Sequence, residues 1–244
     1  MEQTPLRGKV VLITGGSRRI GRGLALGAAE AGADVIIHCH ESTAAAEATK
    51  GEIVSLGRRA WILQADFSQP DQVITLAEKA FEIAPMYGLV NNAAVFAGGP
   101  LPVTTLADWD THMKVNLTAP FLLSQAFGRL LGPNAKGRIV NLLDWRALRP
   151  GIDHFSYTIS KAGLAAMTQS LALSLAPNIS VNGLALGAIL PPGDGERDPE
   201  IVRRVPAGRW GDVEEVVHAL TFLLAGPEYV TGEIIYLDGG RHLV

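Results

Sequence analysis

Cysteine, surplus positive charge and long apolar runs are all scarce in this chain. Its 244 residues include a single cysteine, which excludes an intramolecular disulfide framework and is typical of a reducing compartment. Its 21 basic residues do not exceed its 24 acidic ones, so it lacks the positive charge that non-specific nucleic-acid binding requires. No apolar stretch approaches about 18 residues, and no basic segment followed by an apolar run stands at the start. These absences predict a cytoplasmic protein with no nucleic-acid partner and no membrane span.

Glycine, by contrast, is plentiful at 27 residues, and short apolar runs alternate with longer amphipathic segments along nearly the whole chain. The short runs predict strands over Lys9–Thr14, Asp34–His40, Arg59–Ala65, Gly88–Asn91, Gly137–Leu143, Asn178–Leu184 and Glu233–Leu237. The longer segments predict helices over Ile20–Ala31, Thr43–Leu56, Pro70–Ile83, Leu106–Leu131, Phe155–Ala176 and Val213–Ala225. This alternation is typical of repeated βαβ units. It predicts an α/β fold with a doubly wound parallel sheet of about seven strands flanked by helices.

No repeat, low-complexity run or linker divides the chain, so we predict a single domain over residues 8–244. Residues 1–7 precede the first apolar run and are expected to form a flexible tail. One long irregular stretch, residues 187–198, carries two prolines and three glycines. Loops of this length are uncommon and often functional, which makes it a candidate substrate loop.

A glycine-rich turn follows the first predicted strand directly. Val10–Ile13 runs into Thr14-Gly15-Gly16-Ser17-Arg18-Arg19-Ile20-Gly21-Arg22-Gly23, and a helical pattern begins within that segment. Strand, glycine turn and helix together point backbone N–H groups and the helix dipole at a phosphate. The alternative is a tight turn whose glycines only relieve steric crowding. The position after the first strand of a βαβ series favours a nucleotide site, because doubly wound sheets bind their ligands there.

Several further motifs occur in the order found in one known family. They are Asp66 after the third strand, Asn91-Asn92-Ala93-Ala94 after the fourth, Asn116, Tyr157-x-x-x-Lys161 and Asp238-Gly239-Gly240. With the turn, whose spacing is similar to T-G-x-x-x-G-x-G except that Arg19 replaces a glycine, they resemble the short-chain dehydrogenase/reductase family over residues 8–241. The resemblance implies a Rossmann-type dinucleotide-binding and catalytic domain, an oxidoreductase activity and a homo-oligomer, commonly a tetramer. The cofactor contacts that the turn and the resemblance predict are Gly15, Ser17, Arg18, Arg19, Ile20, Gly21, His38, His40, Ser42, Asp66, Phe67, Asn92, Ala93, Tyr157, Lys161, Gly187 and Ile189.

The end of the second predicted strand bears on the choice between NAD and NADP. An NAD site places a carboxylate there for the ribose 2′-hydroxyl, whereas this chain has Cys39. Donors and positive charge near that position favour NADP, and they are Ser17, Arg18, His38, His40 and Ser42. Glu41 argues the other way, because relatives with a similar segment have an arginine there. We expect no metal at the two histidines, since strand alternation places Cys39 on the face opposite to them.

Tyr157 and Lys161 lie four residues apart and therefore share one face of a helix. A nearby ammonium favours the phenolate and so is expected to lower the pKa of Tyr157. The resemblance implies that Lys161 also binds the nicotinamide ribose and that Asn116 helps to hold a water in a proton relay. Tyr157 would then donate a proton to the substrate as hydride leaves the nicotinamide. The predicted catalytic residues are Asn116, Asp144, Tyr157 and Lys161.

Asp144 stands thirteen residues before Tyr157, where most of the family has a serine that donates a hydrogen bond to a carbonyl. An ionised carboxylate only accepts hydrogen bonds and would repel an oxyanion. It suits a substrate with N–H donors beside the reduced bond, such as a cyclic C=N in an aminopyrimidine ring. The alternative is that Asp144 is a helix cap or an ion-pair partner of Arg146 or Arg149, and that the reaction is an ordinary ketone reduction.

Arg19, Asp144, the His-x-His segment and Phe96 together resemble the pteridine reductase branch of the family. This resemblance implies an aromatic ring that stacks on the pterin, an aspartate that anchors it and an arginine that reaches it beside the cofactor. Phe96 as an ordinary core residue is the alternative. The predicted substrate contacts are Arg19, Phe96, Asp144, Trp145 and Tyr157. Departures from the branch are Ala94, Val95, Glu41 and the pair Leu186-Gly187.

The sequence therefore predicts an NADPH-dependent reductase of a small molecule with a pterin-like or dihydrofolate-like C=N bond. A carbonyl reductase of the 3-oxoacyl or small-ketone type is the first alternative. A catalytically silent NADP-binding sensor is the second. Intact Asn116, Tyr157 and Lys161 argue against a sensor, because binding alone does not need a tuned acid.

Overall fold

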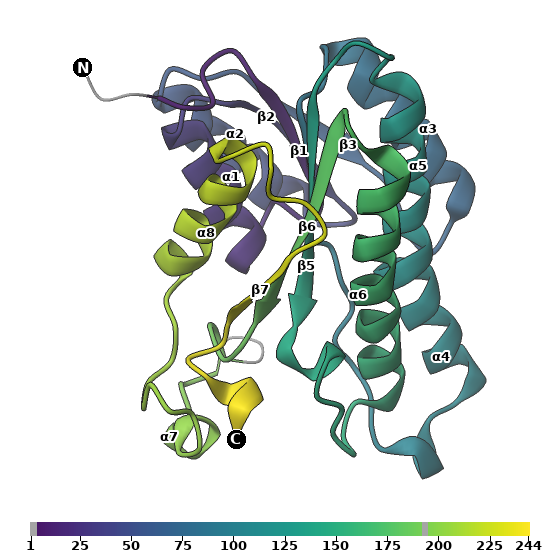
Figure 1. Ribbon diagram of the computed structural model, residues 1–244, viewed down its shortest axis with the longest axis vertical. Coiled ribbons are helices and arrows are strands. Elements are labelled where there is room, and N and C mark those ends of the chain that lie inside the picture. The colour runs from purple at the N-terminus through teal and green to yellow at the C-terminus, as the bar shows by residue number, and fades with distance from the viewer. Residues whose placement is uncertain (1–3, 192–194) are drawn as a thin grey trace.

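The computed structural model describes residues 4–191 and 195–244, and all their strands lie in one parallel sheet (Figure 1). The strand order is β3-β2-β1-β4-β5-β6-β7, which confirms the predicted doubly wound, Rossmann-type sheet of seven strands. The strands are β1 Val10–Ile13, β2 Asp34–Cys39, β3 Ala60–Gln64, β4 Gly88–Asn91, β5 Gly137–Asp144, β6 Ile179–Leu186 and β7 Ile234–Leu237.

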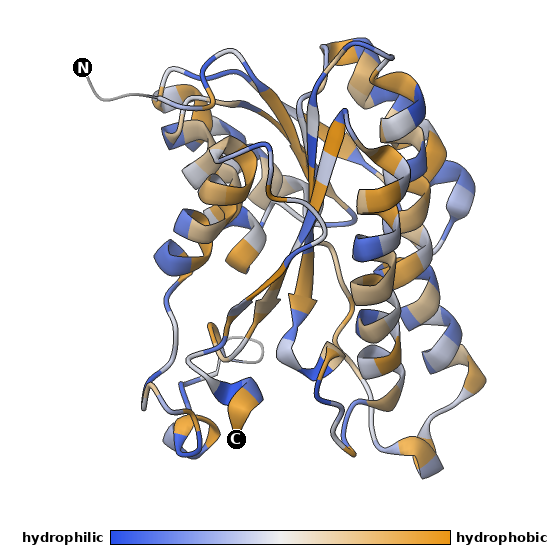
Figure 2. Ribbon diagram, in the orientation of Figure 1, coloured by the Kyte–Doolittle hydropathy of each residue, from blue (hydrophilic) through white to orange (hydrophobic). Residues whose placement is uncertain are grey.

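Helices cover both faces of the sheet, with α1, α2 and α8 on one side and α3, α5 and α6 on the other (Figure 1). The helices are α1 Arg19–Glu30, α2 Thr43–Ser55, α3 Pro70–Ile83, α4 Leu106–Met113, α5 Ala119–Leu130, α6 Phe155–Leu175, α7 Pro199–Val202 and α8 Val213–Ala225. Residues of β1 alternate between the two layers, since Val11 and Ile13 pack in one apolar cluster and Val10 and Leu12 in the other. Burial on both faces explains why the strands are continuous apolar runs, which appear as orange bands in Figure 2.

The segment predicted as one long helix, Leu106–Leu131, is divided. A π-helical stretch, Lys114–Thr118, joins α4 to α5. Pro120 has no N–H to donate to the carbonyl of Asn116, so the regular hydrogen-bond ladder is broken at this point. Such irregular turns are often found at functional sites, and this one carries a predicted catalytic residue.

The predicted flexible tail is wrong for residues 4–7. Leu6 is 1% exposed in the core cluster that contains α1, and its backbone N–H donates to the carbonyl of Ala31. The buried side chain of Leu6 and its hydrogen bond to the end of α1 hold the neighbouring residues in place. Residues 1–3 lie outside the described residues, as do 192–194 of the predicted substrate loop. The described part of that loop is irregular up to α7.

No helix in the described ranges is long and apolar enough to cross a membrane.

Candidate active site

The glycine turn lies at the carboxyl end of β1, where the chain order of the sheet reverses between β2 and β4. Gly15 has a φ of +62°, in the left-handed region that glycine favours. A Cβ on Gly21 would lie 2.0 Å from the carbonyl oxygen of Gly15, so no larger residue fits without moving the turn. Asn92 fixes the turn from β4 by donating to the carbonyl oxygen of Thr14 at 2.8 Å. The result is a backbone cradle of the kind that approaches a phosphate.

A cleft of about 570 Å³ opens over this turn and brings together the predicted cofactor residues of the first four strands. They are Gly15, Ser17, Arg18, Arg19, Ile20, Gly21, His38, His40, Ser42, Asp66, Phe67, Asn92 and Ala93. Ala65 and Val115 also line it; the sequence analysis missed them because small apolar side chains carry no chemical signal. The volume is within the range of cofactor sites, and a lining that combines the glycine turn with polar side chains fits a dinucleotide.

Four other predicted cofactor residues are absent from the described lining of the cleft. Tyr157 and Lys161 lie beyond it in α6. Gly187 packs against Asp238, whose Cα would be 2.6 Å from an added Cβ. Ile189 is buried and lines a separate cavity of about 320 Å³. Direct contact of these four residues with a cofactor therefore remains a prediction.

The end of β2 holds no carboxylate that points into the cleft. Burial raises the pKa of the Cys39 thiol, which keeps this side chain neutral. Glu41 is exposed and lies 4.0 Å from the His40 ring on the surface. The described lining of the cleft includes possible donors from the glycine turn and from the end of β2, namely Ser17, Arg18, His40 and Ser42. This donor set fits a 2′-phosphate better than a free 2′-hydroxyl.

His38 plays a different part from the predicted one. Its Nδ1 accepts a hydrogen bond from the Gly15 N–H at 3.1 Å, and its Nε2 lies 3.1 Å from the Ala65 carbonyl oxygen, which places the ring proton on Nε2. The ring stacks on Phe67 with a centroid distance of 3.9 Å. Burial lowers the pKa of His38 from 6.5 to about 4. The expectation that His38 contributes positive charge is therefore wrong, since it is a neutral side chain that positions the glycine turn.

Arg19 occupies the family's glycine position, and its φ of 54° lies in the left-handed region. This explains why glycine is usual there. The Arg19 guanidinium donates to the carbonyl oxygen of Pro191, so it connects the glycine turn with the predicted substrate loop.

Arg19→Gly is expected to raise the free energy of unfolding by about 0.5–1 kcal/mol, because a left-handed conformation costs an L-residue roughly 1–2 kcal/mol and exposed polar contacts offset only part of that cost. Urea denaturation measures the change. The matched control is Arg18→Gly, whose φ of −145° is extended, so glycine should bring no gain there. A loss of stability in Arg19→Gly would mean that the contacts of Arg19 outweigh its backbone strain.

The predicted catalytic pair is present, but with a different hydrogen-bond pattern. The Tyr157 hydroxyl donates to Asp144 Oδ2 at 3.2 Å. Burial and the Asp144 charge raise the pKa of Tyr157 well above its ordinary value. Lys161 donates to the carbonyl oxygen of Leu142 at 2.7 Å, and burial lowers its pKa from 10.5 to about 8. The prediction that Lys161 lowers the pKa of Tyr157 is not met in this structure, because burial and Asp144 dominate.

Asn116 is buried at the π-helical stretch, and its side chain is fully engaged. Its Oδ1 accepts from the Val95 N–H at 2.9 Å, and its Nδ2 donates to the Val95 carbonyl oxygen at 3.0 Å and to Ser160 Oγ at 3.1 Å. Asn116 therefore fixes the segment after β4 against α6. Its predicted role in holding a water stays a prediction, and the side-chain groups are already occupied.

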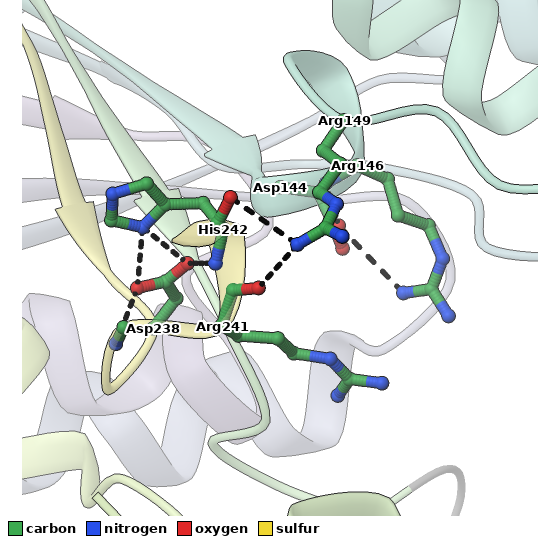
Figure 3. Close-up of polar contacts among 7 residues, drawn as sticks. Asp144, Arg146, Arg149, Asp238, Arg241 and His242 are labelled. Carbon is green, nitrogen blue, oxygen red and sulfur yellow. Dashed lines mark hydrogen bonds and ion pairs between the residues drawn. The ribbon is translucent and has the colours of Figure 1, made fainter. Parts of the chain in front are cut away.

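The two carboxylate oxygens of Asp144 have different partners. Oδ1 accepts from the Arg146 backbone N–H at 2.8 Å and so caps the 3₁₀ turn Trp145–Ala147, and the Arg146 guanidinium lies 3.7 Å away. Oδ2 faces Tyr157. Of the two ion-pair partners considered from sequence, Arg146 is therefore the one observed. Arg149 instead donates to the carbonyl oxygens of Arg241 and His242 (Figure 3).

Aromatic rings line the side of the site next to Tyr157. Phe96 is 48% exposed, so the alternative that it is a core residue is wrong. Its ring stacks on His154 at 4.2 Å and meets Tyr157 edge-on at 4.7 Å. The sequence analysis missed His154, whose φ of 49° is left-handed and whose buried Nδ1 has no partner among the described residues. No sequence motif indicates His154, because only the fold brings it to Phe96.

The sequence model for short chain dehydrogenases matches residues 9–201. The 2-dehydro-3-deoxy-D-gluconate 5-dehydrogenase of Escherichia coli (strain K12) is 34% identical over 246 residues, covering 96% of each chain. A 3-oxoacyl-[acyl-carrier-protein] reductase of Aggregatibacter actinomycetemcomitans is 35% identical over 95% of this chain and 98% of its own. Among solved structures, the FolM alternative dihydrofolate reductase 1 of Brucella canis, complexed with NADP, is 34% identical and has a TM-score of 0.89. That match covers 100% of this chain and 97% of the other.

Proposed function

The chain belongs to the short chain dehydrogenase family, and we propose that it is an NADP-dependent oxidoreductase that reduces a pterin-like or dihydrofolate-like C=N bond. The observation that carries the substrate class is the contact between Tyr157 and Asp144, in which a phenol that can donate a proton lies on a carboxylate that can only accept. The solved dihydrofolate reductase relative with bound NADP supports both the cofactor and the substrate class. We also propose that the protein is cytoplasmic, because a single cysteine is typical of a reducing compartment. We propose a homotetramer because this assembly is common in the family.

Residues of the cleft would hold the cofactor. The glycine turn would bind its pyrophosphate through backbone N–H groups, Asp66 its adenine, and Ser17, Arg18, His40 and Ser42 a 2′-phosphate. Hydrogen bonds from Ser68 lower the pKa of Asp66, which keeps this side chain an acceptor. When bound, the nicotinamide supplies the hydride.

The proton would come from the Tyr157 hydroxyl. A raised pKa keeps this phenol protonated through the neutral range, and its Oη holds the proton on the Asp144 side of the site. Asp144 Oδ2 would also accept an N–H of an aminopyrimidine ring and so orient the C=N bond toward Tyr157. Lys161, buried beside both, keeps its charge below a pH of about 8 and compensates the Asp144 carboxylate.

A carbonyl reductase of the 3-oxoacyl or small-ketone type is the second candidate. It is favoured by the Arg146 contacts of Asp144 Oδ1, because a carboxylate held as a structural cap need not touch the substrate. The two curated relatives described above are named for substrates other than pterins. A silent sensor is disfavoured, since a buried Lys161 costs stability that binding alone would not require.

The deciding experiment is NADPH oxidation with dihydrobiopterin, dihydrofolate and an acetoacetyl thioester as separate substrates. Turnover of a pterin supports the proposal. Turnover of the thioester alone would replace it with the carbonyl reductase. A complete lack of turnover with tight NADPH binding would favour the sensor.

Asp144→Ser is expected to lower kcat/KM for the pterin substrate by about 10- to 100-fold, the value of a hydrogen bond to a charged group. The same change should preserve or raise kcat/KM for a ketone, because serine donates to a carbonyl oxygen. Asp153→Ser is the matched control, since Asp153 also pairs with Arg146, at 3.0 Å, but no contact with Tyr157 is found in the described chain. Equal losses in both variants would reduce Asp144 to a structural role.

A further inference from the structure

The C-terminal residues lie against the substrate side of the site and place an arginine there that the mechanism does not use. The Arg241 guanidinium lies 4.4 Å from the centroid of the Trp145 ring, and that of Arg146 lies 5.0 Å from the same ring. Trp145 directly follows Asp144 in the chain, and Oδ2 of Asp144 accepts the hydrogen bond from the Tyr157 hydroxyl. Two guanidinium groups therefore lie close to one indole beside the reacting groups.

The charge of Arg146 is already compensated. Its guanidinium pairs with Asp153 at 3.0 Å and lies 3.7 Å from Asp144. For the Arg241 guanidinium, the described ranges contain neither a carboxylate partner nor a carbonyl acceptor. The stacking on Trp145 is attractive but satisfies none of the guanidinium N–H groups.

Arg241 is nevertheless held in place. Arg149 donates to the carbonyl oxygens of Arg241 and His242, and the His242 ring stacks on Tyr236 at 3.8 Å. The buried Asp238 carboxylate accepts from the His242 backbone at 2.8 Å, so this acid is not available to Arg241. Figure 3 shows the Arg241 side chain extending away from Asp238 and His242. These contacts fix the backbone of Arg241 and His242, and they do not involve the Arg241 guanidinium.

The environment of Arg241 is unfavourable for a cation. Its side chain is partly buried, and burial together with the neighbouring Arg146 charge lowers its pKa, an effect that the charges of Asp144, Asp153 and Asp238 offset only in part. A fixed, partly desolvated guanidinium loses hydration, and no hydrogen-bond acceptor among residues 4–191 and 195–244 replaces it. An anionic ligand would supply the missing acceptor, and a planar carboxylate matches the two-pronged donor geometry of arginine.

We propose that Arg241 binds a carboxylate of the substrate, next to Trp145, and so makes the enzyme selective for acids over their neutral analogues. The proposal deepens the proposed function, because it names an anionic group within the substrate of that same site. Dihydrofolate has two carboxylates in its side chain and dihydrobiopterin has none. We therefore expect the enzyme to prefer dihydrofolate to dihydrobiopterin.

The test compares acids with their own esters, so that only the charge changes. One pair is dihydrofolate and its dimethyl ester, and the other is acetoacetate and ethyl acetoacetate. We expect kcat/KM for the acid to exceed that for the ester by about 10- to 100-fold, and Arg241→Gln to remove this preference. Arg241→Lys keeps the charge and should restore part of it. Calorimetric binding of all four compounds to the NADP⁺-loaded enzyme gives the same ratios without turnover.

Arg129→Gln is the matched control, because Arg129 is a surface arginine of α5 paired with Glu78 at 3.5 Å. It should leave activity and the acid-to-ester ratio unchanged. The proposal is overturned if acid and ester have equal kcat/KM values and equal affinities in both pairs. It is also overturned if the preference for the acid persists in Arg241→Gln. Failure of the proposed function is a separate result: neither pterin compound is reduced, while the acetoacetate pair still reports on Arg241.

Discussion

Tyr157→Phe is expected to reduce the rate of NADPH oxidation by about 10²- to 10⁴-fold, the usual contribution of a positioned general acid. Phenylalanine keeps the ring that meets Phe96 edge-on at 4.7 Å, so the wall of the site should remain. It removes the hydroxyl that lies 3.2 Å from Asp144 Oδ2, and with it the proton. Single-turnover absorbance measurements on the preformed NADPH complex isolate this chemical step from cofactor binding.

Tyr87→Phe is the matched control for this prediction. The Tyr87 hydroxyl donates to the Leu224 carbonyl oxygen at 2.8 Å, under α8 and away from the cleft. Its loss should lower the free energy of unfolding by about 1 kcal/mol and leave turnover at the wild-type rate. If Tyr157→Phe kept more than about a tenth of the wild-type rate, another group would have to supply the proton.

The fold was predictable because most of its strands are buried on both faces and most of its helices on one. Pro70–Ile83 and Val213–Ala225 have the bounds expected from their apolar spacing. The division of Leu106–Leu131 was not predicted, although Pro120 was the available signal. Helical periodicity continues through a π-helical stretch, so an apolar pattern alone does not reveal the change in hydrogen bonding.

The site was predictable where function depends on residue type at a fixed spacing. The glycine turn is of this kind, as is the placement of Tyr157 and Lys161 on α6. The charge states of His38, Tyr157 and Lys161 were harder to predict from sequence, because burial and residues distant in the chain determine them. Lys161 turns to the Leu142 carbonyl oxygen, and no sequence pattern contains that contact. Arg241 was missed for the same reason, since only the folded C-terminus brings it to Trp145.

Acidification is expected to weaken both folding and cofactor binding through His38. Its pKa is about 4 in the folded protein and near 6.5 when unfolded, so the unfolded state binds the proton more readily. Stability that is fully present above a pH of about 6.5 is therefore lost as the pH falls toward 4, and no further loss arises below that value. The difference between the two pKa values corresponds to about 3 kcal/mol in the free energy of unfolding.

The geometry explains why cofactor binding should follow. Protonation of Nδ1 removes the acceptor of the Gly15 N–H and puts two donors against each other in a buried place. The glycine turn would lose its support from β2 once His38 of the folded protein is protonated, so the Kd for NADPH should rise as the pH falls through about 4. Urea denaturation and NADPH titration, each at a series of pH values, measure the two effects.

His38→Asn separates this effect from general acid denaturation, because asparagine can accept from the Gly15 N–H but does not titrate. It should be less stable than wild type near pH 7, where it lacks the Phe67 stacking and the Ala65 contact, yet lose less stability on acidification. His218→Asn, on the exposed side of α8, is the matched control and should keep the wild-type pH profile. If His38→Asn and wild type lost stability in parallel between pH values of about 6.5 and 4, the buried imidazole would not be the acid-sensitive group of the cofactor site.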